Sequence, residues 1–200
     1  MIEKFYDLKP QVLELDRKTL ELCRDQFAHL EEIRDYNQLK MLRAFTDCGV
    51  EARHFLGSTG YGVWDDSRNK LEEVFSRCMG AEDALVRPQF MSGTHTLTVA
   101  LFGLLRAGDT LLAATGRPYD TLEGVIGIGE AGKGCGTLQE YGIHYDEVPL
   151  LPDFTPDYAA LAEHAKPATV VPLQRSRGYN QRNALDLDNI QKEADTDSQD

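Results

Sequence analysis

The sequence lacks any apolar run of the roughly 18 residues needed to cross a bilayer. The N-terminal stretch MIEKFYDLKPQ also lacks the apolar region of a signal peptide. Positive charge is scarce, since 21 Lys and Arg stand against 33 Asp and Glu and the net charge is −12. Nucleic-acid affinity depends on clustered basic side chains. We therefore expect a soluble, cytoplasmic protein without membrane or nucleic-acid partners.

Cysteine is also scarce, and its spacing excludes the common metal motifs. Cys23, Cys48, Cys78 and Cys135 are far apart, with no CxxC pair and no histidine pair beside them. This pattern is typical of reduced thiols rather than disulfides. The five histidines are equally scattered, so we predict no metal site.

The apolar spacing divides the chain into three parts. It predicts one or two amphipathic helices over 10–46 and another over 66–79, and from there strands and helices alternate. The expected strands are 84–86, 110–114, 144–150 and 169–173, and the expected helices are 95–106, 118–127 and 156–165. Such alternation predicts a mostly parallel sheet with helices on both faces. We expect an N-terminal helical segment (1–56), an α/β domain (57–179) and an acidic, disordered tail (180–200).

The stretch QFMSGTHTLTVALFGLLRAGD, residues 89–109, combines a core helix with an unusual entrance. Its apolar residues follow helical spacing from Leu97 onward. Ser92, Gly93 and Thr94 come just before, where the first amides of a helix lack partners and the dipole favours an anion. The residues alone allow either a phosphate site or a plain helix cap.

A glycine-rich run resembles two nucleotide motifs but lies in the wrong context. GIGEAG, residues 127–132, matches GxGxxG, and its continuation through Lys133 nearly matches a P-loop. The run follows the helical-looking TLEGVI instead of a strand, and Gly134 stands where a P-loop needs Ser or Thr. We interpret the run as a flexible turn.

Three stretches, in order, resemble the fold-type-I pyridoxal-phosphate enzymes. They are HFLGSTGYGVWDDSRNKLEEVFSRCMGAEDALVR, SGTHTLTVALFGLLRAGDTLLAATGRPYDTLEGVIG and LQRSRGY. They are most similar to the methionine gamma-lyase and cystathionine beta-lyase group, in its branch of aluminium resistance proteins. The resemblance covers about residues 5–180. It implies an α/β, transferase-like fold with N-terminal helices and part of a mostly parallel three-layer α/β/α sheet domain that binds pyridoxal phosphate.

The resemblance also implies roles for individual residues. Gly93 and Thr94 would donate backbone amides to the cofactor phosphate, with Ser92 beside them. Tyr119, in GRPYDT, corresponds to the aromatic residue that stacks on the pyridine ring. An aromatic face is a suitable partner for a flat, electron-poor ring. The residues by themselves also allow a tyrosine packed for stability.

Tyr61 falls where the family has a tyrosine that reaches the phosphate of the neighbouring subunit. The lyases pair that tyrosine with an arginine two positions later, where this chain has Val63. Tyr61 can therefore be a cofactor-binding residue or an ordinary loop residue. Because the family completes its sites across subunits, the resemblance implies a homodimer or homotetramer.

The activity that the resemblance implies is cleavage of the carbon–sulfur bond of a sulfur amino acid. In the family, the Schiff-base lysine and the aspartate facing the pyridine nitrogen follow the LQRSRGY segment, and the 200 residues contain no matching motif. Lys133 and Lys166 do not follow a strand in such a motif. We expect these residues alone to hold phosphate without turnover. A truncated, non-catalytic remnant and a phosphate-binding module remain alternatives, and the choice between beta and gamma elimination is open.

Overall fold

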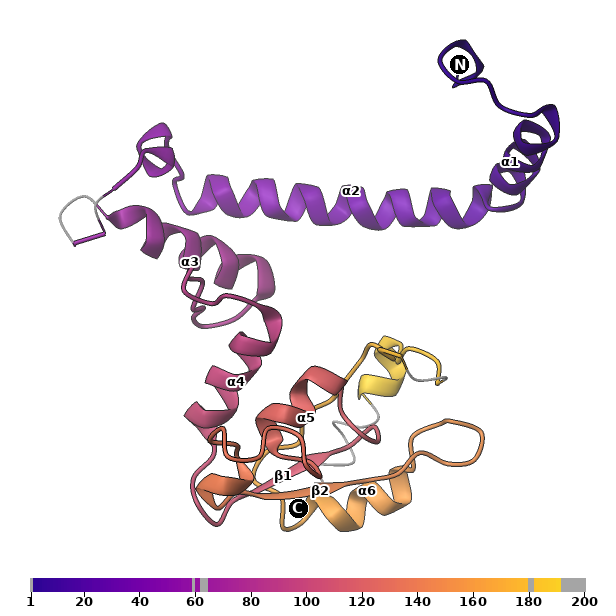
Figure 1. Cartoon of the computed structure of the whole chain (residues 1–200). Helices are drawn as coiled ribbons and strands as arrows, with labels where there is room; N and C mark the ends of the chain where they lie inside the picture. Colours follow the sequence, from indigo (N-terminus) through magenta and orange to yellow (C-terminus); the bar gives the residue numbers. More distant parts are fainter. Residues whose placement is uncertain (1, 59, 62–64, 180–181, 192–200) are drawn as a thin grey trace. The chain divides into compact units, whose positions relative to one another are not determined.

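The chain forms two compact units, Met1–Pro88 and Gln89–Asp200, whose elements are labelled in Figure 1. The computed structural model describes residues 2–58, 60–61, 65–179 and 182–191. The division after Pro88 differs from the boundary that we expected after residue 56. Within the described residues, no helix is both long and apolar enough to cross a membrane.

The regular elements described in the first unit are all helices. Its elements are η1 (Ile2–Lys4), α1 (Pro10–Leu22), α2 (Arg24–Asp47), η2 (Ala52–Phe55) and α3 (Asp66–Met79). The expected helical stretch 10–46 is two helices that meet at Cys23. Helix α3 has the bounds that its apolar spacing predicted, and Gly80 ends it in the left-handed conformation with φ of 67°.

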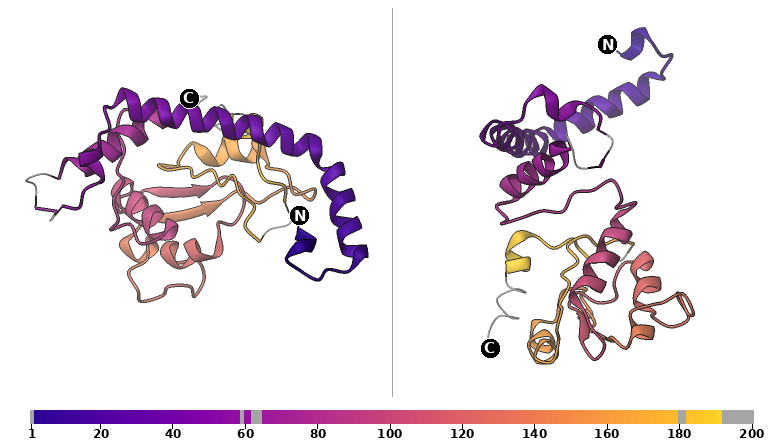
Figure 2. Two further views of the ribbon diagram at one scale, coloured as in Figure 1. Left: turned by 90° about the horizontal axis from the view of Figure 1, so that it is seen from above. Right: turned by 90° about the vertical axis from the view of Figure 1, so that its left-hand side faces the viewer.

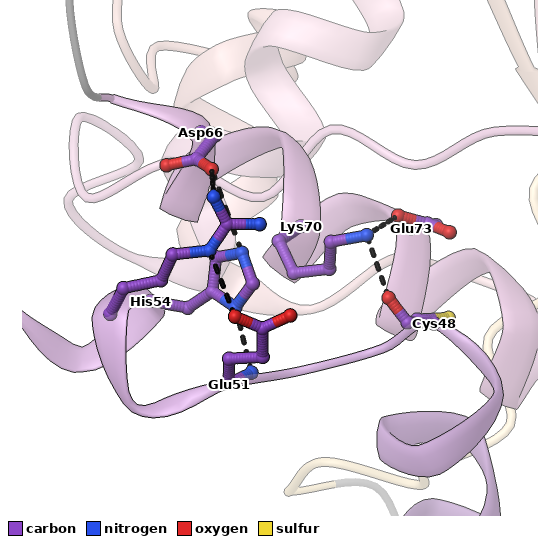
Figure 3. A network of polar contacts seen from close by, with 7 residues as sticks. Cys48, Glu51, His54, Asp66, Lys70 and Glu73 are labelled. Atoms are coloured by element: carbon purple, nitrogen blue, oxygen red, sulfur yellow. Dashed lines mark hydrogen bonds and ion pairs between the residues drawn. The ribbon is translucent and has the colours of Figure 1, made fainter.

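The end of α2 packs against α3 through a small core of Ala44, Cys48 and Val74. Polar contacts around this core hold the connecting turn (Figure 3). The Lys70 ammonium donates to the Cys48 carbonyl at 2.7 Å and to the Glu73 carboxylate at 2.5 Å. His54 Nε2 lies 3.6 Å from the Asp66 carboxylate. Together these contacts fix η2 and the start of α3.

The second unit contains two parallel strands, β1 (Thr110–Ala113) and β2 (His144–Glu147). Their register runs from Thr110 opposite His144 to Ala113 opposite Glu147, and the left view of Figure 2 shows the strands side by side. On the other edge of β1, Val170 forms a single parallel bridge with Leu111. The strand expected over 169–173 is therefore reduced to this bridge.

The strand expected over 84–86 is wrong, because that segment is irregular. The amide of Val86 donates to the Glu72 carboxylate at 2.9 Å, and the Arg87 guanidinium pairs with the same carboxylate. The Glu72 side chain on α3 thus accepts the hydrogen bond that the Val86 amide would otherwise donate to a neighbouring strand.

Helices α4 (Gly93–Leu104), α5 (Asp120–Ile126) and α6 (Tyr158–Ala165) complete the second unit, together with the short η3 (Gln139–Tyr141). Alternate residues of β1 enter two separate cores. Leu111 packs with apolar side chains of α4 and α5, whereas Leu112 packs with Leu161 of α6. Because both faces of β1 are covered by helices, the predicted α/β class is confirmed.

Two local predictions in this unit need correction. Helix α6 is capped by Asp157, whose carboxylate accepts from the Ala160 amide at 3.0 Å. Thr155, which precedes the expected helix start at residue 156, instead donates its hydroxyl to the Asp153 carboxylate. Arg182 and Leu185 are buried, so the loss of apolar residues after position 180 does not mark the end of the packed chain.

Candidate functional site

Helix α4 begins with a side-chain cap and leaves two backbone donors available. Ser92 is extended, and its Oγ accepts a hydrogen bond of 3.1 Å from the His95 amide. Among the described residues, the amides of Gly93 and Thr94 have no acceptor. The first turn has no acidic side chain, and a Cβ built on Gly93 would meet no atom within 4 Å. This helix end can therefore accept an anion.

The first turns of α4 and α5 are joined by a hydrogen bond between two hydroxyls. Thr94 Oγ1 lies 2.8 Å from Thr121 Oγ1. Tyr119 immediately precedes α5, in the loop after β1. This is the carboxyl end of a parallel strand, where α/β sheets bind their ligands. The structure thus brings the loop of Tyr119 beside the capped end of α4.

The side chain of Tyr119 packs against the 173–179 segment. Its ring stacks on Tyr179, with centroids 5.8 Å apart and planes inclined by 24°. A Cβ on Gly178 would lie 2.7 Å from the Tyr119 ring, and Gly178 has a φ of +56°. Tyr179 raises the pKa of the Tyr119 phenol, and burial and the charge of Asp120 add to that shift. The phenol therefore stays protonated at neutral pH.

Tyr119 borders an open pocket of about 130 Å³ at this end of β1. Its lining includes Arg117, Asp120, Gln174, Arg177 and Tyr179. Arg117 forms a two-pronged ion pair with Glu123 at 2.6 and 3.0 Å, which lowers the pKa of that carboxyl. The backbone amide of Tyr119 donates to Gln174 Oε1 at 2.9 Å. The pocket is therefore built from two segments that are distant in sequence.

A buried arginine holds the 174–176 backbone in place. Arg182 is only 1% exposed, and its Nη2 donates to the carbonyls of Gln174 at 2.6 Å and Ser176 at 2.7 Å. Its Nη1 donates to the Asn183 carbonyl at 2.9 Å. Sequence reasoning missed this residue because it lies in a stretch with an acidic, tail-like composition. The only signal was an arginine shortly after the recognised LQRSRGY segment.

The residues just after the glycine-rich run gather three amides around a carboxylate of the protein itself. The Glu140 carboxylate accepts hydrogen bonds from the amides of Gly134, Gly136 and Thr137, at 2.5, 2.8 and 3.1 Å. These three bonds lower the pKa of Glu140 below its ordinary value of 4.5. The run follows helix α5, as its sequence context indicated. The amides that bond Glu140 follow GIGEAG and Lys133, so the run that resembles a phosphate loop does not itself hold this carboxylate.

Replacing Glu140 with glutamine should weaken the hydrogen bonds within the 127–142 loop and lower the Tm of the protein at pH 7. The pKa of Glu140 is lower in the folded protein than in the unfolded chain. Its carboxylate therefore stabilises the fold at pH values above the unfolded-state pKa, and this stabilisation is lost as the pH falls through the folded-state pKa. The difference in Tm between wild type and Glu140→Gln should therefore shrink as pH falls below about 4.5.

The matched control is Glu130→Gln, which removes the same charge from the same loop. Within the part of the chain that the structure describes, the Glu130 carboxylate pairs with exposed Lys133 alone, at 3.0 Å, a pair of little expected energetic value. Equal Tm changes for the two variants at pH 7 would show that the amides around Glu140 do not stabilise the loop.

The remaining predicted residue, Tyr61, belongs to the first unit. Its side chain is 92% exposed. Val63, where the family has an arginine, lies outside the described residues. The role of Tyr61 toward a phosphate stays a prediction. Among the described residues, no group of three or more His, Cys, Asp or Glu could hold a metal ion.

Known proteins resemble this chain over most of its length. A family model described as methionine gamma-lyase matches residues 12–196. The uncharacterized protein YnbB of Bacillus subtilis (strain 168) is 42% identical over 164 residues, which cover 82% of this chain and 39% of YnbB.

Two solved structures have nearly the same fold. A candidate cystathionine beta-lyase involved in aluminium resistance, from Clostridium acetobutylicum, is 37% identical with a TM-score of 0.89. A carbon–sulfur lyase involved in aluminium resistance, from Clostridium novyi NT, is 41% identical with a TM-score of 0.88. Each match covers 96% of this chain and 46% of the other. The chain thus spans less than half the length of these relatives.

Proposed function

Because the chain belongs to the methionine gamma-lyase family, we propose that its second unit forms the phosphate- and ring-binding part of a pyridoxal-phosphate-dependent carbon–sulfur lyase. The proposed substrate is a sulfur amino acid. The observation that carries the proposal is the Thr94–Thr121 hydrogen bond, which places the capped end of α4 beside the loop of Tyr119.

The residues at the start of α4 fit a phosphate. A phosphate oxygen needs donors, and the amides of Gly93 and Thr94 have no acceptor among the described residues. It also needs room and the absence of negative charge, and both are present at Gly93. The positive end of the α4 dipole favours the same charge. The geometry therefore supports the phosphate site that the family resemblance implies.

Each residue would contact the part of the cofactor that its chemistry suits. Gly93 and Thr94 would donate amides to the phosphate, and the Ser92 hydroxyl would lie beside it. Tyr119 would present its ring to the pyridine face, held by the bond from its amide to Gln174. Pyridoxal phosphate, when bound, withdraws electrons from the substrate's α carbon so that a proton and a thiol can leave.

Two further implications of the resemblance stay predictions. One is that Tyr61 reaches the phosphate of a neighbouring subunit within a homodimer or homotetramer. The other is that the 200 residues by themselves show no lyase turnover. Sodium borohydride treatment with pyridoxal phosphate, followed by peptide mapping, tests the second. One dominant labelled lysine with thiol release would contradict it.

Replacing Gly93 with proline should weaken pyridoxal phosphate binding about 10-fold, because one charge-assisted hydrogen bond is removed. Proline lacks the amide hydrogen but suits the first position of a helix. The preceding Ser92 has φ of −163° and ψ of 168°, an extended conformation that a following proline accepts. Fluorescence titration of the purified chain with pyridoxal phosphate measures the effect.

The matched control is Gly93→Ala, which retains the amide and adds a methyl group into open space. Its affinity for pyridoxal phosphate should equal that of wild type. Unphosphorylated pyridoxal should bind all three proteins equally. If Gly93→Pro binds pyridoxal phosphate as tightly as Gly93→Ala does, the phosphate does not lie at the start of α4. If the chain binds inorganic phosphate as tightly as pyridoxal phosphate, the ring adds nothing to the affinity. That result would favour the alternative of a phosphate-binding module.

A further inference from the structure

Helix α4 contains three threonines, and one of them uses its hydroxyl differently from the others. The hydroxyls of Thr96 and Thr98 each donate to the carbonyl four residues earlier in the helix, at 3.0 and 2.7 Å. Threonines inside helices often make such bonds to their own helix. The Thr94 hydroxyl instead lies 2.8 Å from the Thr121 hydroxyl of α5. This contact therefore joins two helices through residues that are 27 positions apart in the chain.

The pair of Thr94 and Thr121 has one hydroxyl hydrogen more than its own bond uses. Each hydroxyl has one hydrogen to donate and two lone pairs that accept. Only one of the two hydrogens lies between the two oxygens. Among the described residues, neither hydroxyl has a further partner. One hydrogen of the pair is therefore available to a ligand.

An anion at the start of α4 selects one of the two orientations of this pair. The amides of Gly93 and Thr94 lack an acceptor in the part of the chain that the structure describes, and the Thr94 side chain belongs to the same turn. If Thr121 donates to Thr94, the Thr94 hydrogen is free for a phosphate oxygen beside these amides. In the opposite orientation, the Thr94 oxygen presents only lone pairs, which repel an anion. Hydrogen bonds arranged in such a chain also strengthen one another.

The position of Thr121 is fixed by the packing of α5. Its neighbour Leu122 is buried in the same core as Leu101 of α4. The Leu122 amide donates to the Tyr119 carbonyl at 2.8 Å, and the Thr121 amide donates to the Asp120 carboxylate at 2.8 Å. The Thr121 hydroxyl is therefore held in place relative to both α4 and the loop of Tyr119.

From this arrangement we propose that Thr121 is a positioning residue for the cofactor phosphate. Its hydroxyl donates to Thr94 and thereby turns the Thr94 hydroxyl hydrogen toward the phosphate. The inference rests on the proposed function, because it requires pyridoxal phosphate at the start of α4. Thr121 itself does not contact the phosphate. Because Tyr119 immediately precedes α5, the same hydroxyl couples the phosphate to the loop that carries the ring-binding tyrosine.

Thr121→Val keeps the shape of the side chain and removes its hydroxyl. This change should lower the affinity for pyridoxal phosphate about 5-fold, because Thr94 loses the bond that orients its hydrogen. The affinity for unphosphorylated pyridoxal should not change. Thr121→Ser restores the hydroxyl and should bind pyridoxal phosphate as tightly as wild type does. Fluorescence titration of the purified chain measures these affinities, and circular dichroism checks that each variant is folded.

The matched control is Thr96→Val, which removes a hydroxyl from the same helix. The Ser92 carbonyl keeps the Thr96 amide as a donor at 3.0 Å, so this variant should bind pyridoxal phosphate as wild type does. A double-mutant cycle separates an indirect role of Thr121 from a direct one. If Thr121 acts only through Thr94, Thr94→Val and the double variant Thr94→Val/Thr121→Val should bind pyridoxal phosphate equally weakly.

The charge state of the bound phosphate gives a second readout. Hydrogen bonds to the doubly charged form lower the pKa of a phosphate group. Thr121→Val should therefore raise the pKa of the bound phosphate above its value in wild type. Phosphorus NMR of the bound cofactor, recorded as a function of pH, measures this change. A loss of affinity without a rise in this pKa would show that Thr121 supports the fold and does not orient a donor.

Three further results would overturn the proposal: unchanged pyridoxal phosphate affinity in Thr121→Val, an equal loss in Thr96→Val, or additive losses in the double variant. Failure of the proposed function is read separately, from Gly93→Pro. If Gly93→Pro keeps its affinity for pyridoxal phosphate, the phosphate lies elsewhere and both proposals fail. If Gly93→Pro loses affinity and Thr121→Val does not, only the role of Thr121 fails.

Discussion

Replacing Gly132 with alanine is expected to destabilise the second unit by about 3 kcal/mol, whereas Gly129→Ala should cost about 1 kcal/mol. Both glycines have positive φ, of +70° and +64°, so both variants incur the strain of a left-handed alanine. They differ in their surroundings. A Cβ at position 132 would lie 2.1 Å from the Gly124 carbonyl oxygen, whereas one at position 129 would meet nothing within 4 Å.

The clash at Gly132 cannot be relieved cheaply. Gly124 lies inside α5, and its neighbours Leu122 and Ile126 are buried in the core of the second unit. Moving the Gly124 carbonyl therefore disturbs α5 and the Tyr119 loop before it. Both variants place an alanine at a left-handed backbone position. The difference in stability between Gly132→Ala and Gly129→Ala therefore measures the clash with the Gly124 carbonyl.

Urea unfolding measures the stability difference, and hydrogen exchange locates it. The Leu138 amide donates to the Val125 carbonyl at 2.9 Å across the loop, so its exchange should accelerate strongly in Gly132→Ala and little in Gly129→Ala. Similar unfolding midpoints for the two variants would contradict the close approach of Gly132 to α5.

The second large effect is expected from Arg182→Met, which should cost about 3 kcal/mol. The methionine fills much of the arginine's volume but cannot donate to the carbonyls of Gln174, Ser176 and Asn183. These bonds are partly buried, and carbonyls that lose a donor there are destabilising. The 174–185 segment should therefore open, and Tyr119 should lose the bond from its amide to Gln174.

Arg182→Lys is a useful second variant. Lysine keeps the charge, but its single nitrogen cannot reach carbonyls in the fork-like arrangement that a guanidinium serves, so we expect an intermediate loss. Exposed Arg175→Gln is the control and should leave stability within about 0.5 kcal/mol of wild type. The Leu185 amide donates to the Arg175 carbonyl at 3.0 Å, so its hydrogen exchange reports on the segment that the Arg182 side chain holds. If the Leu185 amide exchanges equally slowly in wild type and in Arg182→Met, the Arg182 side chain does not hold this segment in place.

Elements with strong local signals were predictable from sequence. Helix α3 has the predicted bounds because apolar spacing and the left-handed Gly80 both act within a few residues. Strand β1 begins at Thr110 as predicted, and Ser92 caps α4 with its side chain. These features depend on neighbours in the chain, so the local sequence contains the necessary information.

Strand predictions were less successful because pairing depends on distant partners. The apolar run at 84–86 satisfies its backbone through Glu72, and the run at 169–173 keeps one bridge, at Val170. A short apolar run states only that a segment prefers burial. Whether it enters a sheet depends on which strand edge lies beside it.

The sequence by itself determined the helices, the α/β class and the family, because these follow from local spacing and from the order of three recognisable stretches. Only the tertiary structure decided which loops meet. Gln174 reaches the Tyr119 amide across 55 residues, and Arg182 is buried although its surroundings in sequence are acidic. Glu140 accepts hydrogen bonds from the amides of Gly134 and Gly136, just after a run that looks like a phosphate loop. Such contacts arise because packing on β1 brings distant backbone groups together, and each buried donor or acceptor then needs a partner.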